Sequence, residues 1–192
     1  MFKSLMTGIL ISTSMANAIA AGSTVFGLGL GAPLDLPQCD KRGRNSTVCW
    51  ESTSSSRSNQ SDLLSNGSVT IRFPIGETPS IVSGGALIGQ IIDGNLEGVG
   101  FNTRGVNNAD FVLAELKNKY GAPSAFVTRV ATNGAGVSHK VFDATWRTDG
   151  VAVVYQSVTR TFDVGLINIH TLKGAAEQRR QLNELAKDKR PL

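Results

Sequence analysis

The chain has 192 residues and a formal net charge of +4, with 41% hydrophobic and 18% charged residues. These fractions are ordinary for a globular protein, so they argue against wholesale disorder and against a membrane protein. Before the carboxyl terminus the basic residues are scattered and do not form a stripe interleaved with aromatics, so nucleic acid is a poor candidate for a partner.

Residues 1–20 have the pattern of a secretory signal peptide. A head with one positive charge, Lys3, precedes an apolar stretch over residues 5–11 and a run of small residues. Cleavage is expected after Ala20, with Ala18 as the alternative. Polar residues follow the apolar stretch, which is therefore too short to span a membrane. We expect an exported protein, periplasmic or secreted, with no integral membrane segment in the mature chain.

Residues 21–68 are predicted to be an irregular entry segment. Its first part is rich in Gly and Pro and predicts a packed but irregular chain, whereas residues 51–68 are rich in Ser and Asn and predict a solvated loop. The two cysteines of the chain, Cys39 and Cys49, both lie in this segment. In an oxidising compartment such an even pair indicates a structural disulfide, because two cysteines are too few for a zinc site.

Residues 69–192 are predicted to form an α+β domain. Alternation of apolar and polar residues predicts strands at residues 69–73, 86–92, 96–103, 142–147, 151–155 and 164–171. Asp93 and Gly94 are favoured residues for a tight turn between the second and third of these strands.

Two helices are predicted in the same domain. The first is expected to be capped by Asn107 and to end at Gly121. The second, residues 175–189, is expected to turn Leu182 and Leu185 inward. Together these elements predict an antiparallel sheet with two helices packed on it.

A duplicated hairpin–helix unit is a further hypothesis. Residues 99–105 resemble residues 167–174, and each segment closes a predicted hairpin and leads into a predicted helix. Strand-to-helix junctions often look alike, so the pattern fits a duplication and also fits two unrelated junctions.

Few residues suggest catalysis. The two histidines have no Cys or carboxylate at ligand spacing, so no metal site is predicted. The glycines near residue 30 lack the spacing of a dinucleotide loop, and no Ser stands in a Gly-x-Ser-x-Gly elbow, so no cofactor and no catalytic residue is predicted. An enzyme would need a site built from dispersed residues, for which the candidates are His139, His170, Asp143 and Glu97. Of these, Glu97 is expected to be an exposed strand side chain.

Three segments carry a resemblance to known proteins. They are Phe-Gly-Leu-Gly-Leu-Gly-Ala-Pro-Leu at 26–34, Ile-Asp-Gly-Asn-Leu-Glu-Gly at 92–98 and Leu-Lys-Asn-Lys-Tyr-Gly-Ala-Pro at 116–123. With them the chain resembles a group of small exported bacterial proteins of unknown function, over nearly all of the mature chain. The helix ending in Tyr-Gly-x-Pro, followed by a strand with Trp146, is also similar to the helix-plus-sheet modules of secreted β-lactamase-inhibitor proteins and outer-membrane assembly lipoproteins. Those modules bind other proteins.

The sequence therefore favours an exported, non-enzymatic protein that binds another protein of the cell envelope. One alternative is a small hydrolase or ligand-binding enzyme with a site built from dispersed residues. The other alternative is an inhibitor of a secreted hydrolase, which would present a protruding loop rather than a pocket.

Overall fold

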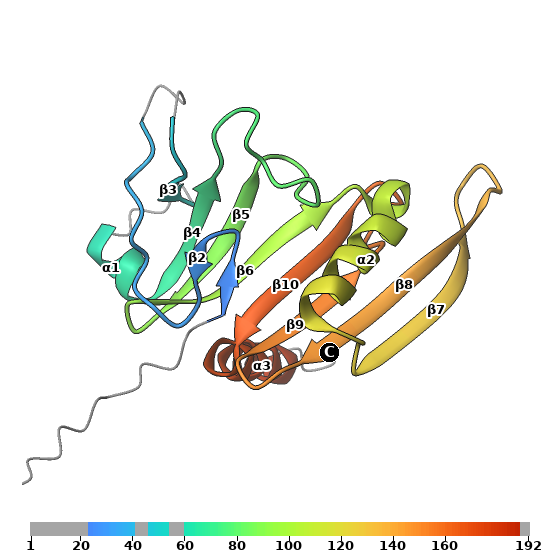
Figure 1. Cartoon of the computed structure of the whole chain (residues 1–192). Coiled ribbons are helices and arrows are strands. Elements are labelled where there is room, and N and C mark those ends of the chain that lie inside the picture. Colours follow the sequence, from blue (N-terminus) through green and yellow to red (C-terminus); the bar gives the residue numbers. More distant parts are fainter. Residues whose placement is uncertain (1–22, 41–45, 54–59, 189–192) are drawn as a thin grey trace, which may run out of the picture.

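A computed structural model describes residues 23–40, 46–53 and 60–188 of the chain. The predicted signal peptide and its cleavage after Ala20 fall outside these residues. In the described part the chain forms one eight-stranded antiparallel sheet with helices packed against it (Figure 1). This arrangement confirms the predicted α+β class.

The strand order of the sheet is β3-β4-β5-β6-β10-β9-β8-β7. Two series of sequential hairpins meet at its centre, where β6 pairs with β10. The strands are β3 (Cys49–Ser52), β4 (Gly67–Arg72), β5 (Ala86–Ile92), β6 (Asn95–Thr103), β7 (Ala125–Thr132), β8 (Ser138–Arg147), β9 (Val151–Gln156) and β10 (Gly165–Thr171).

Helix α2 (Ala109–Tyr120) crosses one face of the sheet with Val112, Leu113 and Leu116 turned inward. Two hydrogen bonds fix its ends: Tyr155 Oη donates to Ala109 O at 3.2 Å, and Trp146 Nε1 donates to Gly121 O at 2.9 Å. Gly121 ends the helix, as predicted, with a φ of 79°. The face under α2 therefore holds the core.

The predicted start of this helix is wrong. A 3-10 turn, η1 (Gly105–Asn108), precedes α2, and Asn108 rather than Asn107 precedes the first helical residue, without a side-chain cap. The Asn107 Nδ2 instead donates to Asp163 at 3.5 Å. Because η1 is bonded to the loop before β10, tertiary contacts and not a local capping box decide where the helix begins.

The entry segment is packed, as predicted, but it contains regular elements. A two-stranded hairpin of β1 (Thr24–Val25) and β2 (Leu28–Gly29) covers part of the core face. Helix α1 (Gln60–Ser65) and strand β3 also fall where an irregular segment and a solvated loop were predicted, so that prediction is wrong for these residues. The apolar residues that are buried in the described part of this region are Val25, Leu28, Leu30, Cys49, Trp50 and Leu63.

Strand β7 has no counterpart among the predicted strands. It is one of the two edge strands of the sheet and is exposed along almost its whole length, and its apolar residues do not alternate with polar ones. Pairing with β8 forms the strand, and Figure 1 shows the β7–β8 hairpin extending beyond the rest of the sheet. An edge strand without a buried face gives little periodicity from which to predict it.

The predicted turn between β5 and β6 is confirmed. Asp93 and Gly94 have φ values of 49° and 79°, the left-handed conformation at both positions that a type I′ turn requires. Beyond the turn the register shifts between Gln90 and Ile91, which leaves Glu97 as an extra residue on β6.

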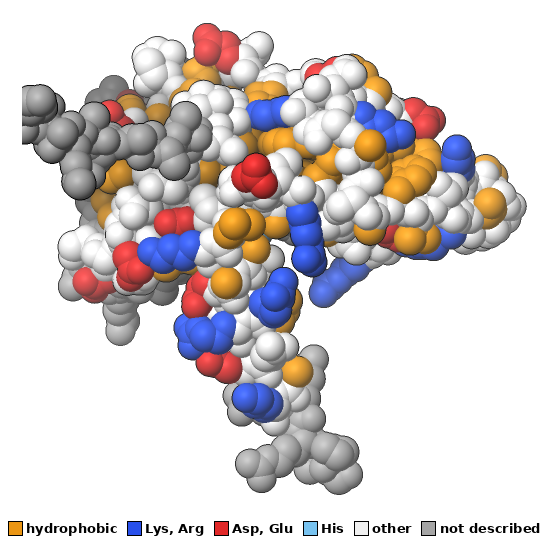
Figure 2. Space-filling view, turned by 60° about the horizontal axis from the view of Figure 1, so that its bottom comes forward, with side chains coloured by type: hydrophobic (Ala, Val, Ile, Leu, Met, Phe, Trp, Pro, Cys, Tyr) orange, Lys and Arg blue, Asp and Glu red, His pale blue; other side chains and the backbone are white. Residues whose placement is uncertain are grey.

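Helix α3 (Leu172–Asp188) follows β10 directly and leaves the sheet on the side opposite α2. Figure 2 shows it projecting from the body of the molecule. The prediction that Leu182 and Leu185 turn inward is wrong, since they are 61% and 62% exposed. No helix among the described residues is long and apolar enough to cross a membrane.

The two hairpin–helix units share the same order of elements but place their helices differently. β5 and β6 lead into α2, and β9 and β10 lead into α3. Because the two helices lie on opposite sides of the sheet, the second unit does not repeat the arrangement of the first (Figure 1).

Candidate functional site

The face of the sheet opposite α2 carries no covering layer among the described residues, apart from α3 at one end. Successive side chains of a strand point to opposite faces, so this face takes the residues between the core positions. They are small, polar or partly exposed aliphatic side chains, such as Ile88 at 48% and Val154 at 40% exposure. We call this surface the open face.

Gly98 of β6 makes a hollow in the open face. Its register partners are Gln90 on β5 and His170 on β10. The His170 ring extends over the glycine so closely that a Cβ at position 98 would collide with the imidazole Nδ1. The absence of a side chain at Gly98 therefore makes room for the His170 ring.

Gly100, two residues along β6, repeats this arrangement. Its register partners are Ile88 and Asn168. A Cβ at position 100 would stand 2.7 Å from the Asn168 Oδ1, which is closer than real contacts allow. The side chains of His170 and Asn168 on β10 thus extend over Gly98 and Gly100 on β6, and the hollow continues along β6.

Helix α3 closes one end of the hollow. Gly174 lets the helix approach β6, because a Cβ there would collide with the carbonyl oxygen of Glu97. Thr171 caps the helix, its Oγ1 accepting the Gly174 N–H at 3.0 Å. Further along the same helix face, Gln178 and Gln181 line the hollow.

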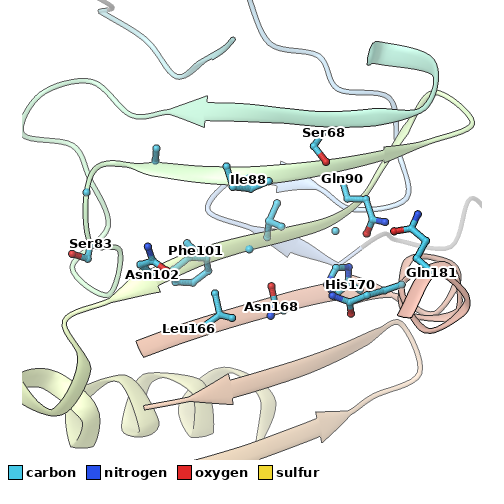
Figure 3. A pocket seen from close by; sticks show the side chains of 16 residues that line it. Ser68, Ser83, Ile88, Gln90, Phe101, Asn102, Leu166, Asn168, His170 and Gln181 are labelled. Atoms are coloured by element: carbon cyan, nitrogen blue, oxygen red, sulfur yellow. The ribbon is translucent and has the colours of Figure 1, made fainter. Parts of the chain in front are cut away.

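The result is a cavity of about 470 Å³, which we call the His170 pocket. Figure 3 shows Gln90, His170 and Gln181 converging on it from β5, β10 and α3. Its volume lies within the range of roughly 300–1,000 Å³ that is typical of small-ligand sites. Its lining residues are Ser68, Ser83, Gly84, Ala86, Ile88, Gln90, Gly98, Val99, Gly100, Phe101, Asn102, Leu166, Asn168, His170, Gln178 and Gln181.

His170 is buried without a hydrogen-bond partner. The residue is 7% exposed, and neither ring nitrogen is bonded to any of the described residues. Burial lowers the pKa of the imidazole, so the ring is neutral at pH 7 and offers one N–H donor and one acceptor. Both nitrogens are enclosed by the protein, so the ring contributes to the shape of the pocket rather than to the hydrogen bonds of an occupant.

The pocket is uncharged. None of the described residues that line it is Asp, Glu, Lys or Arg. The adjoining hollow holds Glu177 and Arg180, whose charges are paired at 2.6 Å. Hydrogen bonds from Arg180 and Gln181 lower the pKa of Glu177 to about 2, so this neighbour stays ionised and paired.

Glu97 is buried at 4% exposure, so the prediction of an exposed side chain is wrong. Its carboxylate accepts a hydrogen bond from the Thr171 Oγ1 and lies 3.8 Å from the Lys173 Nζ. A carboxylate beside the first turn of a helix is also favoured by the helix dipole. Glu97 therefore holds the junction of β10 and α3 and does not line the pocket.

The remaining candidates for an enzymatic site lie elsewhere. His139 and Asp143 are on β8, four residues apart and hence about 13 Å apart along the strand. Asp143 is paired with Arg129 at 3.1 Å, and His139 contacts Asn133 at 3.4 Å. Strand β9 separates them from His170. The described residues contain no group of three or more His, Cys, Asp or Glu placed to hold a metal ion.

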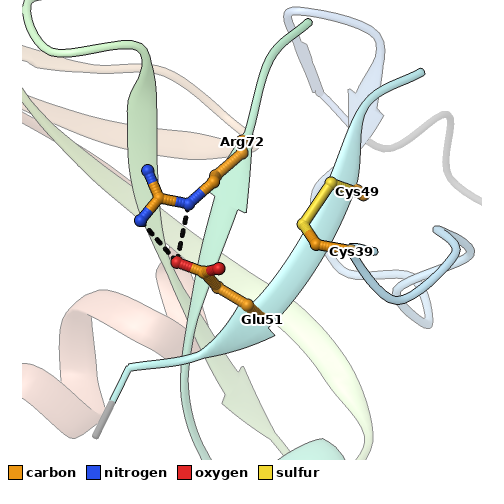
Figure 4. The surroundings of a disulfide bond; sticks show 4 residues. All are labelled: Cys39, Cys49, Glu51 and Arg72. Atoms are coloured by element: carbon orange, nitrogen blue, oxygen red, sulfur yellow. Dashed lines mark hydrogen bonds and ion pairs between the residues drawn. A yellow bond between two sulfur atoms is a disulfide. The ribbon is translucent and has the colours of Figure 1, made fainter. Parts of the chain in front are cut away.

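Cys39 and Cys49 form the predicted disulfide, with their Cα atoms 4.9 Å apart. The Cys39 N–H also donates to Trp50 O at 2.8 Å, so the entry segment is held against β3 at the sheet edge. Figure 4 shows the neighbouring ion pair between Glu51 and Arg72, which joins β3 to β4 at 2.5 Å. The disulfide stabilises the edge and takes no part in the His170 pocket.

Sequence reasoning found one residue of the pocket, His170, and missed the rest. Gln90, Asn168 and Gln181 belong to no motif, because their meaning comes from the pairing of strands that are distant in sequence. The signal that was present is the spacing of Gly98 and Gly100, since glycines inside a strand often mark a close approach by another group.

No protein-family model, curated protein or solved structure matches the chain. A fold alone would not establish function in any case. The function is therefore inferred from the open face and its pocket.

Proposed function

We propose that this chain is an exported, non-enzymatic binding protein that binds another protein of the cell envelope through the open face. The observation that carries the proposal is the hollowed, partly apolar face itself, with α3 projecting beside it. Contiguous exposed apolar surface on a folded domain is typical of an interaction site.

Two walls make up the binding surface. The sheet contributes Ile88, Val154 and Leu166, of which the first two are 48% and 40% exposed. The helix contributes Leu185, which follows Gln181 by one turn and so continues the pocket-lining face of α3 outward. A partner seated in the corner between sheet and helix would bury apolar surface from both.

The chemistry of the pocket supports binding rather than hydrolysis. Its polar side chains are carboxamides, hydroxyls and one imidazole, which donate and accept hydrogen bonds. The hydroxyl of Ser68 belongs to β4, and strands β5 and β6 separate it from His170. At about 4.8 Å per strand, that is roughly 14 Å, far beyond the reach of a nucleophile and its base.

Export is part of the same proposal. It is supported by the signal-peptide pattern of residues 1–20 and by the disulfide between Cys39 and Cys49, a bond that persists in oxidising compartments. The resemblance to exported bacterial proteins agrees with a periplasmic or secreted location.

The test is site-specific photo-crosslinking in cells that export the protein. A photo-reactive residue is placed at Val154 on the open face, and the control position is Ile75, an aliphatic residue that is 97% exposed in the loop after β4. We expect a defined adduct from position 154 and none from position 75. The partner is then purified, and Val154→Asp should weaken its binding about tenfold while Ile75→Asp leaves it unchanged. Equal effects at both positions would refute the proposal.

A second candidate is inhibition of a secreted hydrolase by the β7–β8 hairpin. This hairpin protrudes, as the inhibitor hypothesis requires, and near its tip it exposes Val130 at 71% and Val137 at 51% (Figure 1). The same crosslinking experiment separates the two functions. An adduct formed from Val130 but not from Val154 would favour the inhibitor and reject binding at the open face.

A further inference from the structure

We propose that the His170 pocket receives an uncharged peptide segment of the partner, with a main-chain amide at its polar end and an aliphatic side chain at its apolar end. This inference rests on the proposed function, since it names what the open face recognises. It follows from the charge, the hydrogen-bonding groups and the shape of the pocket.

The charge of the occupant follows from the lining. Moving an ion from water into a site without a counter-charge is costly. None of the described residues lining the pocket is charged, and in the adjoining hollow Glu177 and Arg180 neutralise each other. A carboxylate or an ammonium group would therefore lose its hydration without compensation, and a neutral polar group would not.

The hydrogen-bonding groups match a peptide unit. Gln90 and Asn168 each present N–H donors and a carbonyl acceptor, and Gln181 adds a carbonyl acceptor while its Nε2 donates to Glu177. A ligand that satisfies such a lining must itself offer both a donor and an acceptor a short distance apart. The main-chain amide of a peptide does so without carrying charge.

Recognition must use these side chains and not the sheet backbone. The strands that form the floor, β5, β6 and β10, each pair with a neighbour on both sides, so their backbone groups are engaged in the ladders. Strand addition, which extends a sheet at a free edge, is thus excluded at this place. The carboxamides of Gln90 and Asn168 replace the backbone as the groups that bind an amide.

The apolar end lies along the same hollow. Ile88 of β5 is the register partner of Gly100 on β6, and Leu166 lies two residues before Asn168 on β10. Both are aliphatic, and the one benzene ring among the described lining residues, that of Phe101, turns into the core, 5.4 Å from that of Phe26. The walls therefore suit a branched aliphatic side chain and offer no aromatic ring on which a sugar could stack.

The experiment titrates the purified protein with three small probes and follows its amide resonances by NMR. The probes are N-acetyl-leucinamide, N-acetyl-leucine as its carboxylate and N-acetylglucosamine. We expect N-acetyl-leucinamide to shift the resonances of Gly98, Asn168 and the Gln90 side chain. The carboxylate should bind at least about tenfold more weakly, because the same framework then carries an uncompensated charge.

A matched pair of variants assigns the binding to the pocket. Gln90→Ala should weaken the binding of N-acetyl-leucinamide about tenfold. Gln38→Ala should leave this binding unchanged, because Gln38 is an exposed glutamine of the entry segment, away from the lining. The dispersion of the amide spectrum shows whether each variant is folded. Should Gln90→Ala unfold the chain, Gln181→Ala replaces it, since Gln181 is an exposed residue on the pocket-lining face of α3.

Three outcomes would overturn the inference: no binding of N-acetyl-leucinamide, equal binding of the carboxylate, or preferred binding of N-acetylglucosamine. The proposed function is judged separately, because Val154 lies outside the pocket. If crosslinking at Val154 identifies a partner but the probes fail, the open face binds protein without using the pocket. If both experiments fail, both proposals are wrong.

Discussion

The imidazole of His170 occupies the space that a side chain at position 98 would need. The two residues are register partners on the central strand pair, and the ring lies against the bare backbone of Gly98. This contact buries a polar ring in the middle of an otherwise open surface. It couples the shape of the pocket to the stability of the sheet, so both can be tested with the same substitutions.

Gly98→Ala should destabilise the protein by about 1–3 kcal/mol, because the new Cβ forces the His170 ring out of place. Urea unfolding measures the change. Gly134→Ala is the control, since its Cβ meets no atom within 4 Å and should change stability by less than about 0.5 kcal/mol. In the double variant Gly98→Ala, His170→Ala, most of the penalty of the first substitution should vanish. A strictly additive double variant would show that the ring is not the obstacle.

Stability should decrease as the pH falls below about 6.5, because the unfolded chain then binds a proton at His170 that the folded chain does not. Burial lowers the pKa of this imidazole in the folded state, so the loss develops below the unfolded pKa and levels off below the folded one. Urea unfolding at pH 8 and pH 5 measures it. His170→Gln should reduce the difference, and His139→Gln serves as the comparison. An equal reduction by both variants would contradict the assignment.

The two tyrosines should respond differently to loss of their hydroxyls. Tyr155 Oη donates to Ala109 O at 3.2 Å in the core, so Tyr155→Phe should lower the free energy of unfolding by about 1 kcal/mol. Tyr120 Oη is buried without a partner among the described residues, so Tyr120→Phe should be neutral or slightly stabilising. Thermal unfolding of both variants provides the comparison, and the reverse order would refute the assigned hydrogen bond.

Both tyrosines should also stay un-ionised in the folded protein beyond the usual pH. Burial raises the pKa of Tyr120 to about 12 and raises that of Tyr155 as well. Above about pH 10 the unfolded chain loses protons that the folded chain keeps, so stability falls as the pH rises. Ultraviolet titration should show phenolate appearing together with unfolding. Phenolate formation near pH 10 in a still-folded chain would contradict this prediction.

Replacing both cysteines, Cys39→Ser with Cys49→Ser, should lower the free energy of unfolding by about 3 kcal/mol, because the bond closes a short loop in the unfolded chain. A reducing agent should lower the stability of the wild-type protein by a similar amount. It should leave the double variant unchanged, which is the internal control. Wild-type stability that does not respond to the reducing agent would argue against the bond.

The elements that the sequence predicts well are those whose evidence is local. Alternation of apolar and polar residues predicted β5, β6 and β10. Asp93 and Gly94 predicted the turn between β5 and β6, and Gly121 predicted the end of α2. The failures have a common cause, which is that the deciding contacts are not local. β7 depends on β8, and the start of α2 depends on the loop before β10.

The amphipathic pattern of α3 shows a related limit. Periodicity predicts that Leu182 and Leu185 share a side of a helix, but it does not reveal what covers them. In the structure the described residues leave them exposed. The pocket was missed for the same reason as β7, since the cross-strand neighbours of Gly98 become visible only when the register is known.

The place of β10 in the sheet determines when the protein can fold. It is the last strand in the chain, yet it lies at the centre, between β6 and β9. Without β10, strands β6 and β9 lack their central partner, and each would present an unpaired edge. A chain of this topology can complete its sheet only after nearly all of its residues are available for folding. This order of strands delays closure of the sheet until residues 165–171 are available, which suits the export proposed above.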